Sequence, residues 1–370
     1  MTAKSLTMMV VGDVTLEKPQ GEFFLSKVAP LLRSGDVVVG NGEIVFSEGI
    51  ATYVEMFPSP GCPPENIGAI ASAGFNLITL ATNHVYDRGA RGIEDTIVGF
   101  NNYGIAVVGA GMNIDEARKP AIIERNGVRL GFLNYNCVGP RGQWATMIKP
   151  GCAYVDVITY YENTNNPGGP PDVYTFAEHR SLNAMVDDVK RLRFLCDILV
   201  VIFHKGIRLS PKLAMYDQEV SHAAIDAGAD IVLGHHTLMK GIEQYKGKNI
   251  FHGLGLFCPV AKESNELQIK AKRSFHDPDV SDVLFAQPYP TQYPAKQLTM
   301  IAKCIIDNGE ISQVGYIPCL VNAQHQPEVL KHDERGRQAL NFMKEITKEA
   351  GLNTRYEWKG DEIVIRPGKT

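Results

Sequence analysis

The chain has 370 residues, of which 44% are hydrophobic and 21% are charged, as in a soluble globular protein of one large or two ordinary domains. Its net charge of −4 excludes a general affinity for nucleic acid or for anionic membranes. The seven cysteines are scattered and lack a C-x-x-C pair, which predicts reduced thiols in a cytoplasmic protein. We find no apolar run of membrane-spanning length and no signal-peptide pattern.

Strands and helices alternate along the first third of the chain. Apolar runs predict strands at residues 8–11, 36–40, 75–80 and 105–108. Helical patterns between them cover residues 22–32, 65–73 and 91–103. Such alternation predicts a mostly parallel sheet with helices on its faces. Asn126-Gly127 then predicts a β-hairpin between residues 121–124 and 128–135.

Two stretches without periodicity interrupt this pattern. Residues 136–175 read as a loop insertion, and the tyrosines in it indicate an ordered wall beside a site, with Tyr160 and Tyr174 as candidate substrate-binding residues. Asn41 and His252 are the other two candidates for binding the substrate. Residues 262–297 are rich in proline and aromatic residues and read as a second insertion or lid. A helix is predicted between them, at residues 181–194.

Three apolar runs in the back half of the chain each end on histidine and glycine. The runs at residues 198–203, 231–233 and 249–251 end at His204-Lys205-Gly206, Gly234-His235-His236 and His252-Gly253. Imidazoles at strand ends with small residues beside them are typical of metal or acid–base sites. Two of these residues keep an alternative role. His252 could simply hydrogen-bond the backbone, and Lys205 is either a solvated loop residue or a desolvated base or anion anchor.

The strands of the front half end on carboxylates, amides and one more histidine. These residues are Asp13, Asn41, Glu43, Asn83, His84 and Asp87. Together with the histidines of the back half they form a ligand set for a borderline divalent metal such as zinc, manganese or iron. The same groups could also perform paired acid–base chemistry. Taken alone, Gly12-Asp13 and Asn41-Gly42 are common turns. The prediction of a site therefore depends on the order of the whole set of strand-end residues along the chain.

The last part of the chain predicts a hairpin, a helix and a strand. Residues 299–306 and 311–318 flank Asn308-Gly309, residues 333–349 form an amphipathic helix, and residues 354–365 are strand-like. We therefore expect one domain over residues 1–322, with the two insertions. Residues 323–370 would form a C-terminal helix and strand packed on the same domain.

The order and spacing of six blocks resemble a known family. The blocks are Gly12-Asp13, Asn41-x-Glu43, Ala81-Thr82-Asn83-His84-x-x-Asp87-x-Gly89, His204-x-Gly206, Gly228-Ala229-Asp230-x-x-x-Gly234-His235-His236 and Gly253-Leu254-Gly255. The chain resembles the CapA/PgsA family of capsule and poly-γ-glutamate synthesis proteins, which is related to the calcineurin-like metallophosphoesterases, over roughly residues 7–258. The resemblance implies a metallophosphatase-like, four-layer α/β/β/α sandwich with the site at the carboxyl edge of two facing sheets. The C-terminal hairpin would add strands to the second sheet.

The resemblance also implies roles for individual residues. The metal ligands would be Asp13, Glu43, Asn83, His204 and His235 or His236. His84 would stabilise the reacting oxyanion or protonate the leaving group, and Asp87 would orient it. Three positions depart from the family pattern, because Leu238, Lys205 and Leu256 replace a usual histidine, tryptophan and asparagine. These departures predict one divalent metal (Mn, Zn or Fe) instead of two, or none.

Three functions remain open from the sequence. The first is a metal-dependent hydrolase acting on an amide or peptide-like γ-glutamyl bond, or on a phosphoester, of a small molecule. The second is a metal-independent acid–base enzyme, such as a peptide epimerase, isomerase or lyase. In it, proton exchange with a substrate carbon would involve His84, Lys205, Glu43 and His204. The third is a non-catalytic partner in polymer synthesis.

Overall fold

The computed structural model describes residues 5–48, 61–163, 171–208, 210–236, 238–258 and 295–368. The predicted lid at residues 262–297 lies outside the described residues, except for a short 3-10 turn, η2 (Ala295–Gln297). No helix in the described ranges is both long enough and apolar enough to cross a membrane.

The first sheet runs in the order β18-β19-β16-β15-β1-β2-β3-β4, with β17 on β16. Its strands are β1 (Ser5–Asp13), β2 (Val37–Asn41), β3 (Leu77–Thr79), β4 (Ala106–Val108), β15 (Leu298–Asp307), β16 (Glu310–Val321), β17 (Pro327–Val329), β18 (Thr354–Lys359) and β19 (Glu362–Pro367). The four strands from β1 to β4 are parallel, so their carboxyl ends share one edge.

The second sheet runs in the order β13-β14-β12-β11-β7-β6. Its strands are β6 (Ala121–Arg125), β7 (Val128–Asn136), β11 (Ile198–His204), β12 (Ile231–His235), β13 (Ile242–Tyr245) and β14 (Lys248–Phe251). The strands β7, β11, β12 and β14 are parallel, as buried βαβ units require. The predicted Asn126-Gly127 turn joins β6 to β7 with positive φ at both residues.

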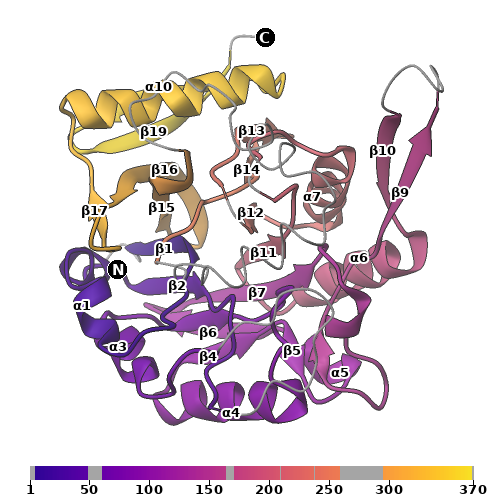
Figure 1. Cartoon of the computed structure of the whole chain (residues 1–370). Coiled ribbons are helices and arrows are strands. Elements are labelled where there is room, and N and C mark those ends of the chain that lie inside the picture. The colour runs from indigo at the N-terminus through magenta and orange to yellow at the C-terminus, as the bar shows by residue number, and fades with distance from the viewer. Residues whose placement is uncertain are drawn as a thin grey trace.

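Three apolar clusters separate four layers. One cluster combines side chains of both sheets, such as Val10 of β1 and Val200 of β11, so the sheets pack face to face. The second lies between the first sheet and the helices α1 (Gly21–Leu25), α2 (Ala29–Leu32), α3 (Asn66–Ser72) and α4 (Gly89–Asn102). The third lies between the second sheet and the helices α6 (His179–Arg193) and α7 (Met215–Ala227). The predicted α/β/β/α sandwich is confirmed (Figure 1).

Smaller elements complete the molecule. They are β5 (Ala110–Gly111), α5 (Ile114–Ala117), η1 (Arg141–Gln143), β8 (Gly151–Cys152), β9 (Val157–Glu162), β10 (Asp172–Ala177) and α10 (Glu334–Glu349). The strands β9 and β10 pair as an antiparallel hairpin that projects from the body, so the stretch expected to be a loop contains regular structure (Figure 1). The helix α10 packs its apolar face on the cluster between the sheets.

Three sequence expectations need correction. The predicted helix at residues 22–32 is two helices, because Pro30 near the start of α2 cannot donate to the preceding turn. The hairpin of β15 and β16 joins the first sheet and not the second, since β15 pairs antiparallel with the open edge of β1. The predicted C-terminal strand is the hairpin of β18 and β19, which turns at Gly360 with φ +64°.

Candidate metal centre

Asp13 ends β1 at a point where two backbones approach closely. A Cβ atom at Gly12 would lie 1.8 Å from the carbonyl oxygen of Gly255, so only glycine fits there. The amide nitrogens of Phe257 and Cys258 both donate to the carbonyl oxygen of Asp13, at 2.9 Å. The segment that follows β14 and contains Phe257 and Cys258 therefore fixes the backbone from which the Asp13 carboxylate extends.

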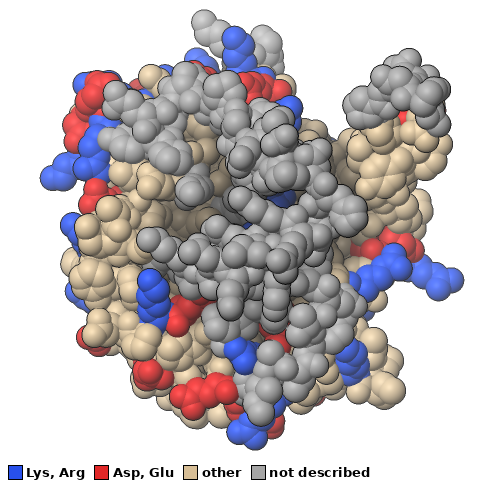
Figure 2. Space-filling model, viewed as in Figure 1, with Lys and Arg blue, Asp and Glu red and all other residues tan. Residues whose placement is uncertain are grey.

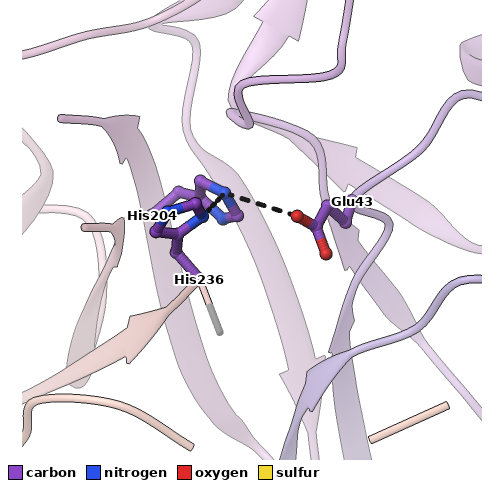
Figure 3. Close-up of side chains that lie close together, drawn as sticks. All are labelled: Glu43, His204 and His236. Carbon is purple, nitrogen blue, oxygen red and sulfur yellow. Dashed lines mark hydrogen bonds and ion pairs between the residues drawn. The ribbon is translucent and has the colours of Figure 1, made fainter. Parts of the chain in front are cut away.

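Glu43, His204 and His236 bring three potential ligand atoms within 4.8 Å of one another (Figure 3). His204 Nε2 lies 3.0 Å from His236 Nδ1 and 4.0 Å from Glu43 Oε1. Asn83 Oδ1 lies 2.8 Å from the same His204 nitrogen. Glu43 and Asn83 follow strands of the first sheet, whereas His204 and His236 belong to the second. The two facing sheets thus supply one half each of the cluster.

His236 reaches the cluster through an unusual backbone conformation. Its φ of +85° is in the left-handed region, which is costly for a residue with a Cβ atom. The amide nitrogen of His236 lies 3.4 Å from Asp13 Oδ1, which accepts a hydrogen bond from it. Strained residues held by their surroundings occur preferentially at functional sites.

His235 occupies a different position from His236. Its Nε2 donates to the carbonyl oxygen of Val11 at 3.1 Å, which ties β12 to β1 across the two sheets. Its buried Nδ1 has no hydrogen-bond partner among the described residues. Of the two candidate histidines, it is His236 whose nitrogen falls within the 4.8 Å cluster.

Burial and mutual repulsion perturb the charged states of the centre. Burial, and next the adjacent Asp13 carboxyl, raise the pKa of Glu43 well above its usual value. Burial also lowers the pKa of His204, and it lowers the pKa of His236 to about 3. At neutral pH the imidazoles are therefore uncharged, which is the form of the ring that binds a metal.

The donor set fits a divalent cation. Two neighbouring carboxylates repel each other, and uncharged imidazole nitrogens lie 3.0 Å apart. A cation between them would offset that repulsion and accept the lone pairs. Carboxylate, amide and imidazole donors suit zinc, manganese or iron. Asp13, Glu43, Asn83, His204 and His236 are the residues that could hold one ion.

His84 borders this cluster on its more open side. Its Nδ1 donates to Asp87 Oδ2 at 2.7 Å, and 25% of its side chain is exposed, against 6% for Asp87. Gln143 Nε2 donates to the second carboxylate oxygen of Asp87 at 3.1 Å. Sequence reasoning missed Gln143, because it lies in the stretch without periodicity. The arrangement fixes the orientation of the His84 ring.

Lys205 and His252 lie together in a separate buried cluster. Successive strand residues face opposite sides of the sheet, so Lys205 points towards α7 while His204 faces the centre. Lys205 Nζ donates to Asp217 O (2.6 Å), Ser221 Oγ (2.9 Å) and His252 Nδ1 (2.9 Å). These bonds occupy all three ammonium protons.

The same cluster continues to the surface through Glu243. His252 Nε2 donates to Glu243 Oε2 at 2.9 Å, and His222 Nε2 lies 2.8 Å from Glu243 Oε1. Burial, and next the Lys205 charge, lower the pKa of His252 to about 4, which fits a neutral ring that accepts from Lys205. Glu243 and Asp217 were not candidates from the sequence, because no motif marks them.

The remaining candidates are Asn41, Tyr160 and Tyr174. Asn41 is fully buried, where its Nδ2 donates to Asp13 Oδ1 and its Oδ1 accepts from Thr79 Oγ1, both at 2.8 Å. It therefore orients Asp13.

Tyr160 and Tyr174 are cross-strand partners on the projecting hairpin, with ring centroids 6.4 Å apart. Figure 2 shows few charged side chains on that hairpin.

Comparison with known proteins identifies relatives of this chain. The family model described as bacterial capsule synthesis protein PGA_cap matches residues 7–259. The capsule biosynthesis protein CapA of Bacillus anthracis is 29% identical over 69% of this chain and 60% of its own length. The PGA biosynthesis protein CapA of Bacillus subtilis is 26% identical over 68% and 63%. The chain thus spans about three fifths of the length of these curated relatives.

Solved structures with similar folds are more distant. A hypothetical protein of Thermus thermophilus aligns with a TM-score of 0.48 and 14% identity, covering 85% of this chain and 98% of its own. The NAD nucleotidase NadN of Haemophilus influenzae aligns with a TM-score of 0.43 and 12% identity, covering 93% and 63%.

Proposed function

The chain belongs to the bacterial capsule synthesis protein PGA_cap family, and from this premise we propose that it is a metal-dependent hydrolase. The observation that carries the proposal is the convergence of Glu43, His204 and His236 within 4.8 Å, beside the His84–Asp87 pair. The proposed substrate is a γ-glutamyl amide or another peptide-like bond, with a phosphoester as the alternative. The names of the relatives refer to capsule and PGA biosynthesis, and they support the γ-glutamyl amide as the substrate.

The residues of the chain divide the proposed chemistry among them. Asp13, Glu43, Asn83, His204 and His236 would hold a divalent ion, which would supply polarisation of the scissile group and activation of water. His84, whose Nδ1 is bound to Asp87, presents Nε2 towards the substrate and donates a proton to the leaving group. The Asp87 carboxylate holds the ring in the required tautomer and stabilises its protonated form.

A non-catalytic role in polymer synthesis is the second candidate. The relatives from Bacillus are named for biosynthesis, not for hydrolysis. This chain spans about three fifths of their length. As a polymer-synthesis partner, it would bind other proteins through a surface of the same fold. The buried carboxylate and imidazole groups favour the hydrolase, because a binding surface has no need of them.

Chelation and reconstitution test the proposed function. The full chain is assayed on γ-glutamyl-p-nitroanilide and on p-nitrophenyl phosphate, before and after exhaustive chelation and after addition of Mn²⁺, Zn²⁺ or Fe²⁺. We expect turnover to disappear on chelation and to return with one of these ions. Activity that survives chelation would favour the metal-independent acid–base enzyme. No turnover by the metal-loaded chain on either substrate would favour the polymer-synthesis partner.

A further inference from the structure

The antiparallel hairpin of β9 and β10 projects from the body of the molecule as an arm (Figure 1). In the described part of the chain, these two strands pair only with each other. A two-stranded hairpin alone is only marginally stable in water, and further strands or an apolar surface normally support it. The arm is therefore an element that gains stability when another surface covers it.

The two faces of the arm have different surroundings. Side chains alternate between the faces along each strand. The face that carries Thr175 and Ala177 meets α7 near the body, because Thr175 Oγ1 accepts from the amide nitrogen of Tyr216 at 3.4 Å and Ala177 is buried. The opposite face carries two cross-strand pairs, Ile158–Phe176 and Tyr160–Tyr174. These four side chains form an apolar patch that faces away from α7.

Much of this apolar surface is open to solvent. Ile158, Tyr160 and Phe176 are 45%, 55% and 38% exposed. At the outer end of the arm, Tyr161 and Val173 of the other face are 61% and 54% exposed. Because an aromatic side chain can bury roughly 150–250 Å², these fractions correspond to roughly 500 Å² of open apolar surface. An apolar patch of this size on a single chain is often a binding surface.

A second copy of the arm matches this surface in size and character. Two arms packed on each other would bury about 1,000 Å² of apolar side-chain surface, which reaches the lower limit for a specific protein interface. The arm carries few charged side chains, so an apolar partner suits it (Figure 2). When a two-fold axis relates identical chains, each arm covers on its partner the same surface that it exposes itself.

Charges at the two ends of the arm indicate how the copies would be oriented. Glu162 and Asp172 are cross-strand partners at the outer end, where two like charges repel each other. Arg180 lies just beyond the inner end, in the first turn of α6, and is exposed. In an antiparallel pair of arms, the outer end of each copy lies beside the inner end of the other. The acidic outer end would then meet a guanidinium.

We propose that the chain forms a two-fold symmetric homodimer through the arm of β9 and β10. The apolar patches pack on each other, and the arms run antiparallel, with Arg180 of each copy beside the acidic outer end of the other. The acidic residues at the inner end do not compete for Arg180. Asp156 pairs with Arg141 at 2.8 Å, and the Glu178 carboxylate caps α6.

Sedimentation velocity of the full chain tests the proposed dimer. We expect a dimer dissociation constant of roughly 1–10 µM, because the interface is small. Ile158→Thr combined with Phe176→Thr keeps strand-forming residues and removes the apolar contact, so it should weaken the dimer by roughly 100-fold. The control is Ile148→Ser, which removes a side chain that is 94% exposed elsewhere on the molecule and should leave the dimer unchanged. Far-UV circular dichroism checks that each variant is folded.

Charge reversal tests the orientation without altering the apolar patch. Arg180→Glu should weaken the dimer by roughly 10-fold, and adding Glu162→Arg to the same chain should restore it. A dimer that Arg180→Glu leaves unchanged overturns the antiparallel arrangement.

Two results overturn the dimer itself. One is an unsubstituted chain that is still monomeric at roughly 100 µM. The other is a dimer that the combined Ile158→Thr and Phe176→Thr variant preserves, which would place the interface elsewhere. A monomeric chain in which that variant raises KM would assign the arm to the substrate instead of a second copy.

Discussion

At the scale of single residues, Asp13 and His84 are each oriented by a second side chain. Asn41 donates to Asp13 and is itself held by Thr79. Asp87 accepts from His84 and from Gln143. Such supporting hydrogen bonds fix ring orientation and tautomer, and their loss reduces metal affinity or activity. The centre is therefore organised before any ligand binds.

Replacing His84 tests its role at this scale. We expect His84→Ala to lower kcat by roughly 10²- to 10⁴-fold, because the leaving group loses its proton donor, while the metal content is unchanged. Asp87→Asn should show a smaller loss of kcat. The control is His179→Ala, a histidine at the start of α6. Full activity of His84→Ala would remove His84 from the mechanism.

At the scale of elements, strand register decides which side chains meet. In the parallel pair of β11 and β12, His204 is the register partner of His235, and the positive φ of the next residue, His236, breaks the strand alternation where its ring meets His204. In the pair of β1 and β2, an irregularity between Val10 and Asp13 brings Asp13 opposite Asn41. The alternation of faces along β11 separates His204 from Lys205.

The position of Lys205 predicts an effect on stability. Lys205→Met removes the buried ammonium that lies 4.0 Å from Asp217 Oδ1. We expect a loss of about 3–5 kcal/mol in the free energy of unfolding, measured in urea at neutral pH. The control is Lys246→Met, which breaks an exposed pair with Asp226 and should change stability little.

The opposite result would change the assignment of Lys205. A Lys205→Met variant with unchanged stability and strongly reduced turnover would place Lys205 in the chemistry, as the acid–base hypothesis requires. Measuring unfolding and turnover on the same preparation distinguishes these results.

At the scale of the whole molecule, the site exists only because two sheets face each other. The strand and helix pattern predicted only a parallel sheet with helices on its faces, and the resemblance of six ordered sequence blocks to the CapA/PgsA family implied the sandwich. From the strand ends the sequence also named Glu43, His204 and either His235 or His236 as ligands. These assignments stay predictions, although Glu43, His204 and His236 do lie within 4.8 Å of one another. The sequence could not predict the separation of Lys205 from the centre, which depends on strand facing, or the role of Gln143. The C-terminal hairpin was expected on the wrong sheet, because the sequence does not show which strands pair when they lie far apart in the chain.

Acidification should destabilise the metal-free chain. Burial lowers the pKa of His235 to about 4 and of His236 to about 3, below the unfolded value of about 6.5. At pH values between about 4 and about 6.5, the unfolded state therefore binds more protons than the folded state. The free energy of unfolding falls as the pH drops through this range. Glu43, with its raised pKa, acts in the opposite direction, so the measurement uses Glu43→Gln.

In the Glu43→Gln variant with chelator present, His235 and His236 should each lower the free energy of unfolding by about 3 kcal/mol at pH 4 relative to pH 7. Urea unfolding across this range measures the loss. A further His236→Asn substitution should reduce the pH dependence. The same slope with and without His236 would show that it titrates normally in the folded chain.

Metal content is the most direct test of the proposed centre. The full chain is purified without added metal, and its ions are counted by mass spectrometry beside Glu43→Ala, His204→Ala and the control His222→Ala, whose imidazole binds Glu243 in the separate cluster. We predict about one divalent ion per unsubstituted chain and per control chain, and almost none in the other two. Equal metal in all four proteins, or none in the unsubstituted chain after incubation with Mn²⁺, Zn²⁺ or Fe²⁺, would contradict the assignment of Glu43, His204 and His236 as ligands.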